Sequence, residues 1–276
     1  MGELIPRFPR GTPLFPGVVL PLQIFEPRYR RLMRDLLAVP DAEDRRFFGV
    51  VAIRQGWEVE HVAPAEAMYD IGCSARVQAV RAEPDGGFRI VTVGGERFRL
   101  LDVVIGDEPP YLQAEVEWLI DEEQAEEAAG DHDGIVDPSG LVVPSVAAAG
   151  LEDVVASVAR GSMSVLSRNV RDLFTCYVAE VAGLSAGGDD DPVPAVDAET
   201  AVLLHAVTGD PTALSYLVAS TALLTTEDRQ ALLAESATRR RLAAESRLLR
   251  RELTLLQELG AVPAPLRQFA APMTVN

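Results

Sequence analysis

Residues 14–30 read LFPGVVLPLQIFEPRYR, and this stretch decides how the N-terminal part of the chain folds. In Phe15-Pro16-Gly17, proline fixes φ and glycine permits close backbone approach, so a sharp turn is expected before a strand. The apolar run Val18–Ile24 predicts that strand, and Pro21 within it removes one ladder donor, which indicates an edge or bulge position. A helix is predicted over Glu26–Val39, because its first carboxylate favours the positive end of the helix dipole and apolar residues recur on one stripe.

The flanking sequence, from Leu4 to Leu119, has period-two patterning and short apolar runs punctuated by Gly and Pro, which is typical of β-structure. Its clearest hairpin turns at Asp85-Gly86-Gly87, which supply the positive φ of a tight turn. A second strand pair is expected after Gly94-Gly95. The predicted strands are Val18–Ile24, Phe47–Ile53, Ser74–Val80, Phe88–Val93, Arg97–Val104 and Tyr111–Leu119.

The composition changes after residue 120. Seven acids and no base lie between Asp121 and Asp133, which predicts a flexible acidic linker. Beyond it the apolar spacing becomes helical, with a break expected at Gly161 and a long last helix from about Glu227, capped by Thr226, to Leu259. The predicted organisation is a β domain over 1–120, the acidic linker over 121–145, a helical domain over 146–260 and a Pro-containing tail over 261–276.

At this point the β region resembles a known family. The string Phe15-Pro16-Gly17 to Arg30 is similar to the opening of the Lon N-terminal (substrate-binding) domain, and further matches follow in the family's order. These are Phe48-Gly49-Val50-Val51, Asp70 to Val77, the Asp85-Gly86-Gly87 turn and Gly94 to Leu100, with a looser likeness over Leu217 to Leu256.

The resemblance implies an α+β fold, with a PUA-like, β-rich pseudo-barrel followed by an all-α region, and a role in holding protein substrates or partners. In the full-length proteases an ATPase module and a Ser-Lys peptidase follow. All 25 basic residues here are arginine, so neither a P-loop lysine nor a Ser-Lys dyad exists in these 276 residues. We therefore expect a non-enzymatic module that captures unfolded segments or a specific protein, as an adaptor for a separate protease or ATPase.

Two sets of residues are candidates for protein binding. Phe15, Pro16, Leu22 and Phe25 either fold the domain or form an exposed apolar groove for extended peptides. Arg239, Arg240 and Arg241 belong to a run of six arginines in thirteen residues, which is either a solvated face or a surface that docks on acids, in the 121–133 segment or on another protein.

Two further function classes stay open as alternatives. One is a small-molecule sensor or enzyme with a pocket in the β domain, lined by Trp57, Tyr69, Tyr111 and Trp118. The other is RNA binding through the Arg-rich last helix, although the net charge of −17 disfavours nucleic acid and anionic membranes in general. A leucine stripe on the last helix predicts a bundle core, with self-association as the alternative reading.

Little else in the sequence indicates chemistry. The three histidines lack metal-ligand spacing, no nucleophile elbow occurs, and the Asp189–Asp191 run lacks the spacing of a calcium loop, so no catalytic residue, metal or cofactor is predicted. Cys73 in a strand and Cys176 on an apolar helix face are expected to be structural. Without a signal peptide or a long apolar run, a cytoplasmic protein is expected.

Overall fold

The computed structural model describes residues 2–38, 46–54, 67–104, 108–121, 148–185 and 198–259. The predicted linker beyond Asp121, the tail after Leu259, Trp57 and Asp189–Asp191 lie outside these residues. The strands are β1 (Glu3–Arg10), β2 (Val19–Ile24), β3 (Phe47–Ala52), β4 (Ile71–Ala82), β5 (Phe88–Val104) and β6 (Gln113–Leu119). The helices are α1 (Pro27–Ala38), α3 (Ala148–Ser185), α4 (Ala198–Ala206), α5 (Pro211–Thr221), α6 (Thr226–Ala234) and α7 (Thr238–Leu259).

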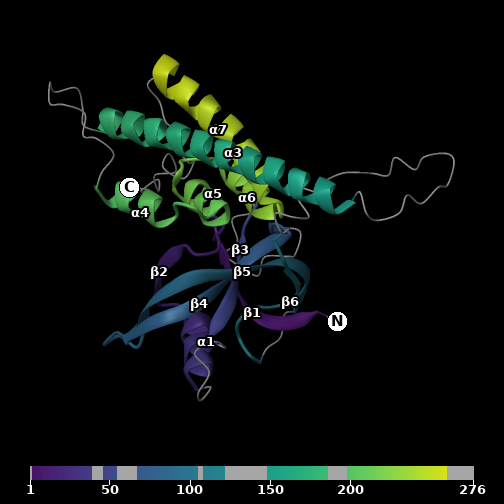
Figure 1. Ribbon diagram of the computed structural model, residues 1–276. Helices are drawn as coiled ribbons and strands as arrows, with labels where there is room; N and C mark the ends of the chain where they lie inside the picture. Colours follow the sequence, from purple (N-terminus) through teal and green to yellow (C-terminus); the bar gives the residue numbers. More distant parts are fainter. Residues whose placement is uncertain are drawn as a thin grey trace. The chain divides into compact units, whose positions relative to one another are not determined.

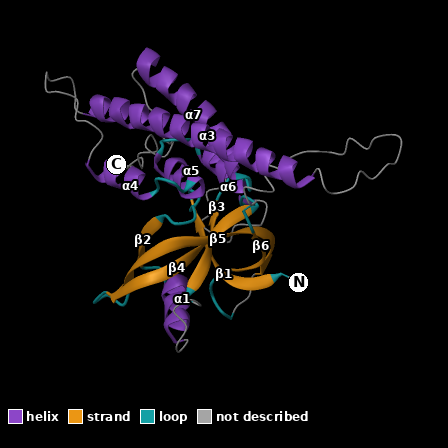
Figure 2. Cartoon of the chain, in the orientation of Figure 1, coloured by secondary structure: helices purple, strands orange, loops and turns teal. Residues whose placement is uncertain are grey.

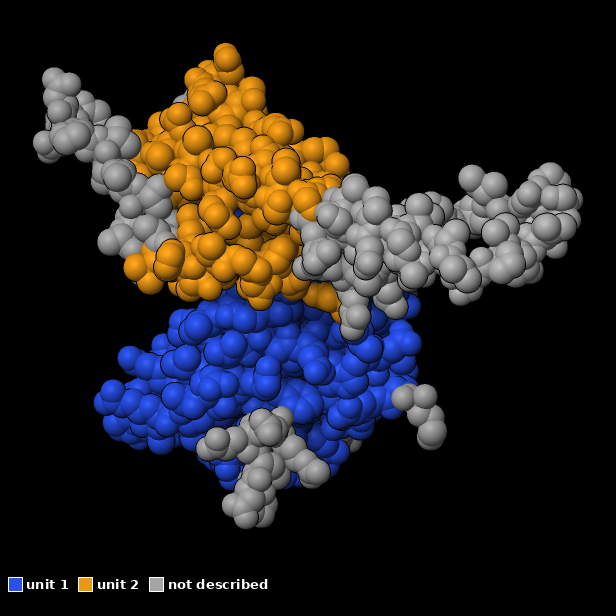
Figure 3. Space-filling model, in the orientation of Figure 1, with its two compact units in different colours: residues 1–120, 216–234, 262–276 blue, residues 121–215, 235–261 orange. Residues whose placement is uncertain are grey.

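The chain divides into two compact units, coloured separately in Figure 3. Of the described residues, those up to Ile120 and those of Tyr216–Ala234 form unit 1, whereas the others form unit 2. Helix α6 therefore belongs with the strands, although it follows the helical region in sequence. The predicted domain boundaries themselves stay a prediction.

Six strands in unit 1 form one sheet in the order β2-β5-β4-β3-β1-β6, and β5 also pairs with β6, so the sheet curls into a ring (Figures 1 and 2). Among the strand pairs of the described residues, β1–β3 alone is parallel. Closing the ring requires β5 to serve both sides, and its 17 residues are long enough to do so. The predicted pseudo-barrel followed by helices is confirmed, and the fold class is α+β.

The Phe15-Pro16-Gly17 turn has the form that the sequence predicts. Gly17 has φ of 75°, and its N–H donates to the carbonyl of Gly94 at 2.8 Å. Strand β2 and helix α1 follow within a residue or so of the expected bounds. Among the described strands β2 pairs only with β5, so Pro21 lies in an edge strand of this sheet. Helix α1 packs its buried stripe against the inner face of β2 and β5, which makes one of the two cores of the ring.

Strand β5 runs unbroken through Gly94-Gly95, where a break between two strands was expected. A Cβ on Gly94 would lie 2.0 Å from the carbonyl oxygen of Phe15, and a Cβ on Gly95 would lie 2.5 Å from Ser74 Oγ. These glycines therefore permit close packing within the ring rather than ending a strand. Past them, Phe98 is fully buried and packs edge-on against Trp118, in the second core.

The helical predictions need three corrections. Helix α3 continues through Gly161 without a break. The predicted last helix is two helices, α6 and α7, separated by residues 235–237. The cap of α6 is Thr225, whose hydroxyl accepts the N–H of Asp228 at 3.1 Å, and not Thr226.

Two hydrogen bonds hold α6 against the sheet of unit 1. Gln230 Nε2 donates to the carbonyl of Ile71 at 2.8 Å, and a guanidinium nitrogen of Arg97 donates to the carbonyl of Leu233 at 2.8 Å. The second bond takes a carbonyl of the last turn of α6, which would otherwise lack a partner. Helix α6 is thus fixed by contacts with residues more than a hundred positions away in sequence.

Candidate protein-binding surface

The four N-terminal candidates do not form one exposed groove. Phe15 is only 1% exposed, and its ring lies 6.2 Å from that of Tyr216 in α5. Pro16 and Leu22 are half-buried, and Leu22 packs against the core beneath β2. Phe25 alone is well exposed, at 63%. Of the two interpretations of Phe15, its burial agrees with the one in which it folds the domain, because the turn that contains it directs its ring inward.

The arginine run on α7 is divided in the same way. Arg239 and Arg240 are exposed, but Arg241 is fully buried and is not a docking residue. Its guanidinium donates to Ser215 Oγ at 2.7 Å and to the carbonyl of Glu235 at 2.6 Å, and it lies 3.6 Å from a carboxylate oxygen of Asp121. Asp121, the first residue of the predicted acidic linker, is therefore an ion-pair partner of the arginine run within the same chain. The rest of that segment lies outside the described residues.

The leucine stripe of α7 is a core feature of unit 2. Leu242, Leu249, Leu253 and Leu256 are all buried, and α7 packs against α3 (Figure 1). Glu245 is also fully buried on α7, with no hydrogen-bond partner for either carboxylate oxygen among the described residues. Burial raises the pKa of its carboxyl well above the usual value, and the nearby Arg241 opposes this only in part. The bundle interpretation of the stripe is confirmed for these leucines.

A different surface gathers exposed apolar side chains: the outward face of β2, β5 and β4, called here the outer face. In the strand register, Pro21 of β2 lies opposite Val91 of β5, which lies opposite Ala79 of β4. All three are exposed, and residues directly opposite one another on antiparallel strands present their side chains on the same side of the sheet. Next to this row Val19, 60% exposed, lies opposite Val93.

Arginines border the apolar rows of the outer face. Arg76 lies opposite Val93, and Arg81 lies opposite Arg89, which in turn lies opposite Gln23. All three arginines are exposed, and Arg89 forms an ion pair with Glu83 at 3.3 Å. The outer face thus combines an apolar centre with basic edges in a chain whose net charge is −17. Such a combination suits apolar segments that carry acids.

The edge position of β2 affects how a segment could bind there. An edge strand offers its backbone for pairing with another chain, and a proline within it interrupts such pairing because it has no N–H. Pro21 is placed near the middle of the six-residue β2. The outer face is therefore better suited to side-chain contacts than to the addition of a long strand.

The aromatic residues proposed for a ligand pocket in the β domain are distributed between separate clusters. Tyr111 belongs to the α1 core and donates to a carboxylate oxygen of Asp35 at 3.1 Å, and burial together with this bond raises the pKa of its phenol to about 12. Trp118 packs against the other core and donates to Glu3 at 2.7 Å. Tyr69 lies under the guanidinium of Arg54, 4.8 Å from its ring centre.

Two absences hold for the part of the chain that the structure describes. It contains no group of three or more His, Cys, Asp and Glu side chains placed to hold a metal ion. Within the same ranges, no helix has both the length and the apolar character that crossing a membrane requires.

Sequence reasoning missed most of the outer face. It singled out the inward-pointing Phe15 and Leu22 and passed over Val19, Val91 and the bordering arginines. The available signal was the alternation of β5, where Arg89, Val91 and Val93 alternate with the buried Ile90 and Thr92. Which of these positions align with β2 and β4 depends on register, which single-strand patterns do not contain.

Comparison with known proteins identifies the family. The profile described as ATP-dependent protease La (LON) substrate-binding domain matches residues 5–251. Lon protease 1 of Herpetosiphon aurantiacus is 26% identical over 249 residues, which cover 90% of this chain and 24% of that protein. Lon protease of Flavobacterium johnsoniae is 31% identical over 128 residues, which cover 46% of this chain and 14% of that protein.

Among solved structures, the N-terminal domain of Mycobacterium avium complex Lon protease aligns with a TM-score of 0.50 at 15% identity, and covers 90% of this chain and 98% of that one. At this identity the likeness shows the fold alone. The chain spans 24% and 14% of the length of the two curated relatives above. Because the family profile covers nearly the whole sequence, the motif resemblance is confirmed, and the chain belongs to the Lon substrate-binding domain family.

Proposed function

We propose that this chain is a non-catalytic module that binds unfolded or extended protein segments on the outer face of unit 1. The observation that carries the proposal is the register of β2, β5 and β4, which aligns Pro21, Val91 and Ala79 as an exposed apolar row between arginines. Membership of a substrate-binding family supports a protein ligand. An adaptor role, in which the bound segment passes to a separate protease or ATPase, is part of this proposal.

The chemistry of the outer face defines the preferred segment. Apolar side chains would cover the parts of Val19 and Val91 that remain exposed, 60% and 38%. Each would contribute less than the roughly 1.5–3 kcal/mol that complete burial of such a side chain gives. Acids flanking the apolar part would pair with Arg76 or Arg81, which would add on-rate and salt dependence more than affinity. The expected ligand is therefore a short apolar stretch with acidic neighbours, held without covalent chemistry.

A direct test uses fluorescence anisotropy with a labelled, unstructured peptide that has an apolar centre and acidic flanks. Replacing Val91 with Glu should weaken binding about tenfold, because a buried carboxylate would oppose the peptide's apolar side chains and acids. Leu101→Glu is the matched control, since Leu101 is a 50% exposed residue of the same strand that lies away from these rows. Equal affinity for wild type and Val91→Glu, or an equal loss in the control, would refute the proposal.

A further inference from the structure

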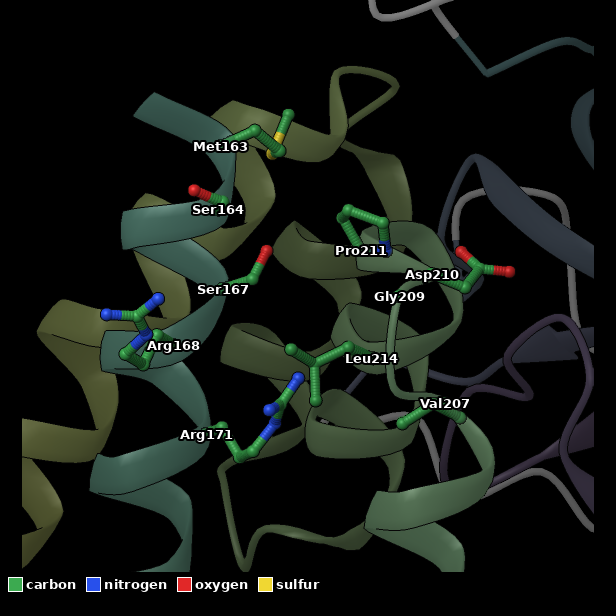
Figure 4. Close-up of a pocket in the computed structure, with 10 residues that line it drawn as sticks. All are labelled: Met163, Ser164, Ser167, Arg168, Arg171, Val207, Gly209, Asp210, Pro211 and Leu214. Carbon is green, nitrogen blue, oxygen red and sulfur yellow. The ribbon is translucent and has the colours of Figure 1, made fainter. Parts of the chain in front are cut away.

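Unit 2 contains a pocket of about 300 Å³ between α3 and the start of α5 (Figure 4). Its walls are of two kinds. Met163, Pro211 and Leu214 provide apolar surface, whereas Ser167, Arg168 and Arg171 of α3 provide hydrogen-bond donors. The spacing of three and four residues places the polar side chains on one stripe of α3. A volume at the low end of the range for ligand pockets fits a small molecule or a single terminal group.

Two of the pocket donors are buried without an acceptor. Ser167 is 8% exposed, and its hydroxyl has no hydrogen-bond partner among the described residues. The same holds for Nε of Arg171. In Figure 4 the Arg171 side chain extends from α3 toward Leu214 of α5, and the Ser167 hydroxyl points from α3 toward the side on which Pro211 lies. Buried donors are normally satisfied, so two unsatisfied donors in one pocket indicate that an acceptor belongs between them.

The charges around the pocket favour an anion. Arg168 and Arg171 bring two guanidinium groups, and among the described residues neither forms an ion pair with an acid. Asp210 is the acid that lines the pocket, but its carboxylate accepts the N–H of Ala213 at 2.9 Å, as the cap of α5. Figure 4 shows this carboxylate pointing away from the arginines. A guanidinium matches a carboxylate with paired hydrogen bonds, and the apolar wall leaves room for a short hydrocarbon group.

We propose that this pocket binds a carboxylate that carries an apolar group, which is either a small free acid or the C-terminal carboxylate of a peptide ending in an apolar residue. The carboxylate oxygens accept from Arg171 and Ser167, with Arg168 at the rim, and the apolar group lies against Met163 and Leu214. The site is in unit 2 and uses no residue of the outer face. A loss of binding at this pocket would therefore leave peptide binding at the outer face unchanged, and the two proposals can be tested independently.

Calorimetric titration of the full chain with hexanoate, with hexanamide as its neutral counterpart, tests the chemistry. Hexanoate should bind saturably in the millimolar range or tighter, and hexanamide at least tenfold more weakly. A second pair of probes, a short peptide ending in leucine with a free or an amidated C-terminus, separates the two sources. Binding of only the free-terminus peptide assigns the site to peptide ends, and binding of hexanoate without the peptides assigns it to small acids.

Variants connect the binding to the pocket. Arg171→Gln should lose at least tenfold in affinity for the probe that binds, and Ser167→Ala several-fold. Arg168→Gln changes an exposed side chain, so it should weaken binding without any change in helix content by circular dichroism. Arg247→Gln removes an exposed arginine of α7 that does not line the pocket, and should bind as wild type does. The proposal is overturned if neither hexanoate nor the free-terminus peptide binds, if the neutral probes bind equally well, or if Arg171→Gln keeps wild-type affinity.

Discussion

Replacing Gly94 with alanine should destabilise unit 1 by an amount that the structure allows to be worked out. The new Cβ would lie 2.0 Å from the carbonyl oxygen of Phe15 and 2.8 Å from its carbonyl carbon. Both are backbone atoms, so no side-chain rotation relieves the clash, and the turn must move away from β5. That movement breaks two hydrogen bonds, from Gly94 N–H to the carbonyl of Val18 and from Gly17 N–H to the carbonyl of Gly94.

Each of these bonds contributes about 1 kcal/mol net, and forced overpacking adds about 1–3 kcal/mol, so a loss of roughly 3–5 kcal/mol is expected. Guanidinium unfolding followed by tryptophan fluorescence measures it, because both tryptophans, Trp57 and Trp118, lie in the sequence of unit 1. Gly161→Ala is the matched control, and its unfolding is followed by circular dichroism because α3 belongs to unit 2. Among the described residues, no atom beyond the neighbouring residues and the backbone of α3 lies within 4 Å of its new Cβ. Because the site is inside α3, this change should stabilise the chain by about 1 kcal/mol. An unchanged unfolding midpoint for Gly94→Ala would refute the reasoning.

Three further predictions concern buried and exposed groups. The raised pKa of Glu245 means that, above the usual carboxyl pKa, the folded state holds a proton that the unfolded state has released. Stability should therefore fall with rising pH by up to about 1.4 kcal/mol per unit, and Glu245→Gln should flatten this slope in urea titrations at several pH values. Arg241→Met should destabilise unit 2 by about 3–5 kcal/mol by thermal unfolding, whereas Arg247→Met, at an exposed site, should change it little. Cys176 is exposed and Cys73 is fully buried with a raised thiol pKa, so a thiol reagent should modify one cysteine in the native chain and two after denaturation.

The features that sequence predicted well are those with local causes. The Phe15-Pro16-Gly17 turn, β2, α1 and the hairpin at Asp85-Gly86-Gly87 each follow from residues within a few positions of one another. Gly86 has φ of 80°, and the N–H of Gly87 donates to the Asp85 carboxylate at 2.9 Å, as the turn chemistry implies. In these places the backbone preference and the final packing agree, so propensity alone is sufficient.

The features that sequence predicted poorly have distant causes. From sequence alone, a pair of glycines such as Gly94-Gly95 predicts the end of a strand. The actual cause, the close approach of the Phe15 carbonyl, becomes apparent only in the fold. An arginine reads as solvated, yet Arg241 and Arg7 are both fully buried. Arg7 donates to the sulfur of Met68, and burial lowers the pKa of its guanidinium to about 10. Besides the nearby Glu235, Arg241 contacts Ser215, 26 positions away, and Asp121, 120 positions away. The sulfur that accepts from Arg7 lies 61 positions away. The fold brings these distant partners together.

The outer face depends on an irregularity that alternation cannot reveal. If β4 alternated strictly from the exposed Arg76, Val80 would point outward and Ala79 inward. Instead a bulge between Val77 and Ala79 shifts the register, so Val77 and Val80 both pack against the core while Ala79 lies opposite Val91. One extra residue in β4 therefore moves Val80 into the core and aligns Ala79 with the apolar row. The same shift places Arg81 opposite Arg89. The apolar centre and basic edge on which the proposed binding of protein segments rests thus come from the bulge as much as from the residues themselves.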